Sequence, residues 1–202
     1  MKRFFVGLAA FILTIPGQAI SGEVIDNATV GLHVSKPDGW QYLTAEVNAS
    51  NLRNLHLDDK DFQAAVAKYA TAPIIAFTKY AEPYDDVNPS FKINLRPQGG
   101  LAGRSASEVL AAVLPGLKRA FADLAIQQEP LATTVSGMPA SYARLTYTMT
   151  NGGKQYPVTS EMWIVPRGQY FFVIGAGSRQ DEANGTRAEI HAIIDKLRID
   201  PQ

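Results

Sequence analysis

The chain has 202 residues, 46% of them hydrophobic, with no cysteine and with equal numbers of acidic and basic residues. This length is enough to bury one sizeable core without covalent staples. The missing cysteines exclude disulfides, thiol catalysis and cysteine metal sites, and a net charge of zero gives no electrostatic attraction to nucleic acid or anionic lipid.

The amino terminus has the pattern of a secretory signal. Lys2 and Arg3 precede the uncharged apolar segment 4–15, which is too short for a membrane span of roughly 20 apolar residues. Small residues follow, so we expect cleavage after Ala19, with cleavage after Ser21 as the close alternative. An uncleaved amino-terminal anchor is the less favoured interpretation.

We therefore expect a signal peptide over 1–19, with cleavage as late as residue 22, and a single globular α+β domain over 23–202. Without Lys2 and Arg3, 17 basic residues face 19 acidic ones, a net charge of −2. The mature protein is expected to be periplasmic or secreted, with no membrane span after cleavage and no nucleic-acid partner.

The first half of the domain mixes strands and helices. Residues 31–40 predict a strand and an Asp38-Gly39 turn that returns Trp40 to the core. Residues 58–69 have helical spacing of apolar residues. Two further strands are expected at 73–80 and 90–95, on either side of an acidic loop.

The strongest predicted helix runs from Ala106 to Leu124. Ser105 and Glu108 have the spacing of a capping box, and Pro115 predicts a kink or a break near Leu114. The expected apolar stripe is Val109, Leu110, Val113, Leu114, Leu117, Phe121 and Leu124.

The second half predicts an antiparallel series of strands, because only short turns separate them. A closing helix follows, from about Glu182 or Thr186 to Leu197. The sequence thus indicates a central antiparallel sheet flanked by helices, an α+β fold. The expected strands are 131–135, 140–148, 156–165 and 170–175.

This order of elements resembles the PsbP/Mog-type fold, an α/β/α sandwich. The resemblance rests on Val34–Trp40, Val135–Ala140, the hairpin ending in Tyr170–Ile174 and the apolar end Leu197–Ile199, and it covers roughly 30–199. Members serve as photosystem accessory subunits, GTPase-binding proteins and envelope proteins of unassigned role. The resemblance implies a non-enzymatic binding or accessory module and carries over no functional residue.

The common catalytic and cofactor motifs are missing, so no catalytic or cofactor-binding residue is assigned. The chain has no Gly-x-Ser-x-Gly elbow and no phosphate loop. Gly175-Ala-Gly177 lacks the third glycine of a dinucleotide loop. We interpret it as the end of a strand, where the backbone needs conformational freedom.

No metal site is assigned either. His33, His56 and His191 have no second histidine at metal-ligand spacing. His56 precedes Asp58, Asp59 and Asp61, which leaves a divalent-metal site as an alternative, but acidic residues at a helix start explain the pattern better.

The most acidic loop supplies the predicted contact surface. Its carboxylates leave calcium binding as a further alternative, but the flanking prolines favour a stiff surface turn. Aromatic residues of the sheet predict core packing more strongly than an exposed binding patch. The residues that we predict to contact a partner are Glu82, Tyr84, Asp85, Asp86 and Asn88.

Together these patterns favour an exported accessory or binding protein that recognises a protein or an envelope component. Two alternatives stay open. One is a periplasmic hydrolase whose Asp, Glu and His residues come together only in the fold, and the other is a small-molecule carrier with a large, dry internal pocket.

Overall fold

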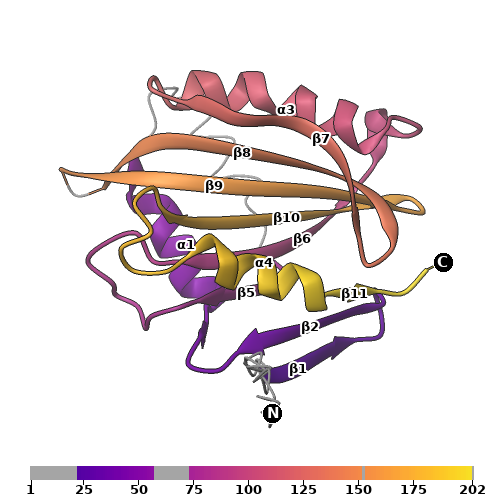
Figure 1. The fold of residues 1–202 in the computed structure, drawn as a ribbon, viewed down its shortest axis with the longest axis horizontal. Helices are drawn as coiled ribbons and strands as arrows, with labels where there is room; N and C mark the ends of the chain where they lie inside the picture. The colour runs from indigo at the N-terminus through magenta and orange to yellow at the C-terminus, as the bar shows by residue number, and fades with distance from the viewer. Residues whose placement is uncertain (1–21, 57–72, 152, 202) are drawn as a thin grey trace, which may run out of the picture.

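The computed structural model describes residues 22–56, 73–151 and 153–201 (Figure 1). The helix expected over 58–69 lies outside these residues. In the described part, an eight-stranded antiparallel sheet dominates, and a smaller three-stranded sheet lies beside it. This arrangement confirms the α+β class. No helix among the described residues is long and apolar enough to cross a membrane.

The large sheet has the order β3-β5-β6-β10-β9-β8-β4, and β7 also pairs with β8. The small sheet has the order β1-β2-β11. The strands of the large sheet are β3 (Gln41–Tyr42), β4 (Leu55–His56), β5 (Ile75–Thr78), β6 (Ser90–Pro97), β7 (Ala125–Val135), β8 (Met138–Asn151), β9 (Lys154–Arg167) and β10 (Tyr170–Arg179). Those of the small sheet are β1 (Gly22–Asn27), β2 (Leu32–Pro37) and β11 (Arg198–Ile199), and the helical segments are α1 (Ala45–Asn54), η1 (Gly99–Leu101), α3 (Ala106–Ala120) and α4 (Arg187–Lys196).

The expected antiparallel series is confirmed in β7 to β10, which pair as consecutive neighbours. The largest errors in the expected strand boundaries concern β7 and β10. β7 begins at Ala125 rather than Leu131. Its first part is an edge strand in which two register irregularities break the alternation of side chains, so the sequence pattern did not reveal it. β10 continues to Arg179 rather than ending at Gly175, so the strand-exit interpretation of Gly175 and Gly177 was also wrong.

The capping box of α3 is confirmed, because Ser105 and Glu108 each bond the other's backbone amide. Of the expected kink or break near Leu114, the break was wrong, since the helix continues through Pro115 to Ala120. Proline has no backbone N–H, so the carbonyl of Ala111 loses its helical hydrogen bond. Ala111 and Pro115 both lie on the exposed side of the helix, where water can bind this carbonyl.

One face of the large sheet packs against α3. Val109 and Leu110 of the helix are buried against Ile164 and Phe171 of the strands. Val113 is 37% exposed, contrary to the predicted stripe, and Phe121 caps the helix three residues before its expected end at Leu124.

The other face carries α4 and the small sheet. Thr186 caps α4 with a second capping box, as one of the two expected starts, and Ile190 and Ile193 are buried in the main core. Trp40 is 4% exposed in the same core, which confirms the turn that returns it from β2. The two loops at the ends of β5 and β10 meet at one edge of this face (Figure 1).

Two glycines offer a test of these backbone assignments. Gly175 adopts a strand backbone, whereas Gly137 in the β7–β8 turn has φ of 75°, and an added Cβ would meet no atom within 4 Å at either position. We expect Gly175→Ala to raise the free energy of unfolding by about 0.5 kcal/mol through the lower entropy of the unfolded chain. Gly137→Ala should lower it by about 1 kcal/mol because its φ disfavours a side chain. Urea unfolding measures both, and changes of the same sign would contradict the assignments.

Candidate functional site

The predicted contact residues lie on the acidic loop, defined here as residues 80–89 between β5 and β6. This loop docks against the β10–α4 loop, residues 180–186. The Tyr80 hydroxyl donates to the carbonyl of Asn184 at 2.7 Å, and the Asn184 side chain donates back to the carbonyl of Val87 at 2.6 Å. Two segments far apart in the sequence thus hold each other in place.

Two of the predicted contact residues hold the acidic loop together from within. The Asn88 side chain accepts a hydrogen bond from the Tyr80 amide at 3.0 Å and donates one to the Tyr80 carbonyl at 2.9 Å. It thus replaces the pair of backbone hydrogen bonds that a facing strand residue would make. Glu82 accepts from the Asn88 side chain at 2.9 Å and from the Tyr84 amide at 3.1 Å. Their polar atoms are therefore committed to the shape of the loop.

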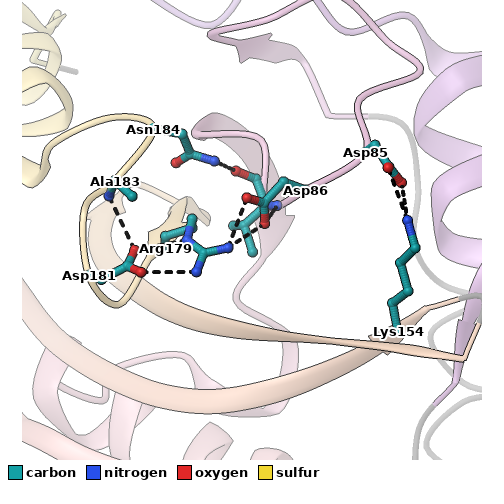
Figure 2. Close-up of polar contacts among 8 residues, drawn as sticks. Asp85, Asp86, Lys154, Arg179, Asp181, Ala183 and Asn184 are labelled. Carbon is teal, nitrogen blue, oxygen red and sulfur yellow. Dashed lines mark hydrogen bonds and ion pairs between the residues drawn. The ribbon is translucent and has the colours of Figure 1, made fainter.

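Arg179, the last residue of β10, joins the two loops through charge (Figure 2). Its Nη1 donates to both carboxylate oxygens of Asp86, at 2.7 and 2.8 Å, and its Nε and Nη2 donate to Asp181, at 2.8 and 2.9 Å. The hydrogen bonds from Arg179 lower the pKa of Asp181 to about 2. They also raise the pKa of the guanidinium, with Asp181 as the larger cause and Asp86 as the second.

The outward side of the acidic loop carries Tyr84 and Asp85. The Tyr84 ring stacks on Tyr80 at a centroid distance of 4.7 Å. The Asp85 side chain is 87% exposed and pairs with Lys154 of β9 at 2.8 Å. Figure 2 shows that Asp85 and Asp86 point to different cations, Lys154 and Arg179. Their carboxylates therefore do not converge as a calcium site requires, and the described residues contain no group of three or more metal-ligating side chains.

A second polar cluster lies between α4 and the large sheet, and the sequence analysis did not predict it. Glu161 of β9 is only 1% exposed, yet its Oε1 accepts from the Tyr142 hydroxyl, from Arg187 Nη2 at 3.1 Å and from His191 Nε2 at 2.9 Å. The His191 ring meets Trp163 edge-on, at 5.7 Å between centroids. The cluster ties the closing helix to the centre of the sheet.

The donors of this cluster determine the charge state of Glu161. Burial raises the pKa of Glu161, but hydrogen bonds from Tyr142, His191 and Arg187 outweigh it, so the pKa lies below its ordinary value of 4.5. Burial, followed by the hydrogen bond to Glu161, raises the pKa of Tyr142 to about 12. Glu161 is therefore a carboxylate at neutral pH.

Two signals in the sequence point to this cluster in hindsight. Glu161 alternates with Trp163 and Val165, so a charged residue falls on a buried strand face. Arg187 and His191 are four residues apart and share one side of the closing helix. Neither signal identifies the partner element.

The structure describes the surroundings of only one of the other two histidines. His33 lies between two carboxylates, with Nδ1 at Asp26 and Nε2 at Asp200, 3.0 Å away. These hydrogen bonds raise its pKa, with Asp200 as the larger cause. The alternative built on His56 includes Asp58, Asp59 and Asp61, which lie outside the described residues.

The aromatic residues of the sheet pack mainly in the core, as the sequence predicted. Phe91, Trp163 and Phe172 are at most 4% exposed. Tyr170, at the end of the β9–β10 hairpin, is 42% exposed. In the described residues, the large exposed apolar side chains (Val24, Tyr42, Val113, Leu131 and Tyr170) belong to different elements.

Replacing the buried carboxylate tests the cluster. We expect Glu161→Gln to lower the free energy of unfolding by about 2 kcal/mol at pH 7, because Arg187 and His191 lose their shared anion. The folded-state pKa of Glu161 lies below the unfolded value, so its stabilisation is present above pH 4.5 and is lost as the pH falls through the folded-state pKa. The stability difference between the two proteins should therefore shrink in acid, as measured by denaturant unfolding from pH 7 to pH 3.

Glu129→Gln is the matched control, since Glu129 is exposed on the edge strand β7. It should leave stability nearly unchanged. A Glu161→Gln effect no larger than that of the control, or one that grows in acid, would contradict the assigned role.

No family model and no curated protein matches the sequence. Several solved structures share its fold. LpqN of Mycobacterium tuberculosis, described as involved in cell envelope biogenesis, is 16% identical over 89% of this chain and 90% of LpqN, with a TM-score of 0.50. The cyanobacterial PsbP protein CyanoP from Synechocystis sp. PCC 6803 is 12% identical over 91% of this chain and 96% of CyanoP, also with a TM-score of 0.50. PA94 of Pseudomonas aeruginosa, a protein of unknown function, is 9% identical over 90% of this chain and 99% of PA94, again with a TM-score of 0.50. The chain has the PsbP-like fold that the order of its elements indicated.

Proposed function

We propose that the protein is an exported, non-enzymatic accessory or binding protein that recognises a protein or an envelope component. Its contact surface is the pair of docked loops, residues 80–89 and 180–186. We also propose that the arrangement of its helices is the helix-flanked sandwich of the PsbP/Mog-type fold.

The observation that carries the proposal is the combination of a fixed backbone with exposed charge. Glu82, Asn88 and Arg179 hold the two loops from within. Asp85 and Asp181 remain 87% and 54% exposed. A surface that is ordered before binding loses little conformational entropy on contact, which favours recognition by a small area.

The charge of this surface indicates the chemistry of its partner. Asp85 and Asp181 are acidic and exposed, whereas the guanidinium of Arg179 is largely covered at 21% exposure. Such a surface complements a basic patch, and its contribution should fall with ionic strength.

The Glu161 cluster supports the non-enzymatic side of the proposal. Its titratable groups converge, as the hydrolase alternative requires. However, Glu161 is 1% exposed and Trp163 4% exposed, and Oε1 already accepts three hydrogen bonds. A substrate cannot reach this carboxylate without displacing α4, so the geometry favours a structural role over hydrolysis.

The export proposal predicts the amino terminus of the mature protein. β1 begins at Gly22, immediately behind the expected cleavage sites, so cleavage after Ala19 or Ser21 leaves the strand whole. Amino-terminal sequencing of the protein from a periplasmic fraction should therefore begin at Ile20 or Gly22. A protein that began at Met1 would contradict export by a cleaved signal.

The contact surface can be tested by site-specific photocrosslinking in cells. The photoreactive amino acid p-benzoylphenylalanine is placed at position 84 in the acidic loop, and at the exposed position 131 on β7 as control. Position 84 should give a discrete crosslinked species that position 131 does not give.

A charge reversal then links the crosslink to the surface charge. Asp85→Lys should lower the yield from position 84 about fivefold, whereas Glu129→Lys, the same charge change on β7, should leave it unchanged. Crosslinks of equal yield from positions 84 and 131, or none from either, would rule out the docked loops as the contact surface.

A further inference from the structure

A pocket of about 250 Å³ with a mixed polar and apolar lining lies on the sheet face that carries α3. Along β10, this face presents Phe171 and Val173 to α3 and then continues with Gly175 and Gly177. A Cβ on Gly175 would meet no atom within 4 Å, and one on Gly177 would meet Ser90 Oγ at 3.3 Å. The two glycines therefore leave open the space that larger side chains would fill.

Lys92 of β6 brings a positive charge to this pocket. It pairs with Gly175 across the strands, and its Nζ donates to Asn48 Oδ1 of α1 at 2.8 Å. Asn48 is itself only 6% exposed, so the acceptor that orients the ammonium is fixed. No ion pair within the described part of the chain includes Lys92.

Burial lowers the pKa of Lys92, and the more distant charge of Glu82 only partly opposes this effect. Lys92 is half-buried, and its acceptor among the described residues is a neutral amide, so its ammonium is suited to bind an anion. Of its three donors, one is used by Asn48. An anion in the pocket would add a charged partner that the described residues do not supply.

The rest of the described lining is neutral and rich in hydrogen-bonding groups. Ser90, Tyr147 and Ser160 contribute hydroxyls and Asn94 contributes an amide. No carboxylate lines the described part of the pocket. A single ammonium surrounded by neutral donors is suited to a negatively charged oxygen group.

We propose that this pocket binds a small oxyanion, presented as a carboxylate or phosphate group, with Lys92 as its charged contact. Ser90, Asn94 and Ser160 provide neutral hydrogen bonds, and the bare backbone at Gly175 and Gly177 provides the room. The pocket volume of about 250 Å³ suits a compact molecule. This site is separate from the docked loops and does not rest on their role.

The test is a titration of ¹⁵N-labelled protein followed by backbone amide NMR, at constant ionic strength set with sodium chloride. The probes are acetate, succinate and inorganic phosphate, which distinguish carboxylate from phosphate binding. At least one probe should give saturable shifts at Lys92, Gly175 and Gly177.

Three variants make the test specific. Lys92→Met removes the ammonium and keeps the apolar stem, and Gly175→Leu fills the pocket from a position with no atom in the way; each should weaken binding at least tenfold. Lys154→Met removes an exposed lysine that pairs with Asp85 and should leave the affinity unchanged. Amide spectra of all three variants without anion establish that they are folded.

Three outcomes would overturn the proposal. The first is that no probe gives a saturable shift. The second is that folded Lys92→Met and Gly175→Leu both bind like the wild type. The third is that Lys154→Met weakens binding as much as Lys92→Met, which would indicate a general response to charge.

Discussion

The bond network of Arg179 is the interaction on which the candidate surface depends. One guanidinium binds Asp86, 93 residues away in the sequence, and Asp181, two residues away, with a pair of hydrogen bonds to each. Arg179 is the last residue of β10, so it fixes both loops to the end of a central strand of the large sheet. Without Arg179, and within the described residues, Asp86 would keep only the hydrogen bond from the Val87 amide, and Asp181 only that from the Ala183 amide.

The two faces of the large sheet use polar residues differently. On the α4 face, Oε1 of the buried Glu161 accepts from three donors and joins the closing helix to the strands, while its Oε2 has no hydrogen-bond partner in the described residues. On the α3 face, Lys92 lines a pocket that Gly175 leaves open, and its acceptor in the described residues is a neutral amide. The first arrangement binds a buried carboxylate to the closing helix, whereas the second places a cation beside open space that suits a ligand.

The sequence predicted most of the elements whose signals are local. The capping box at Ser105 and the start of the closing helix at Thr186, one of the two expected starts, are such signals, and both are present. The sequence did not predict α1, whose apolar residues are too few to form a stripe, or the edge part of β7, whose bulges break the alternation. The acidic loop was found from its composition. Its docking on residues 180–186 was not, because no local pattern records that Tyr80 and Asn184 meet across the fold.

The central claim is that the docked loops are ordered before any partner binds. Backbone ¹⁵N relaxation of the free protein measures this most directly, at the amides of residues 84–88 and 181–184. We expect order parameters of about 0.85, equal to those of the sheet, together with a clear fall in both loops when Arg179 is replaced by Gln. Values below about 0.6 in the wild-type loops would contradict the claim, because the surface would then form only on contact.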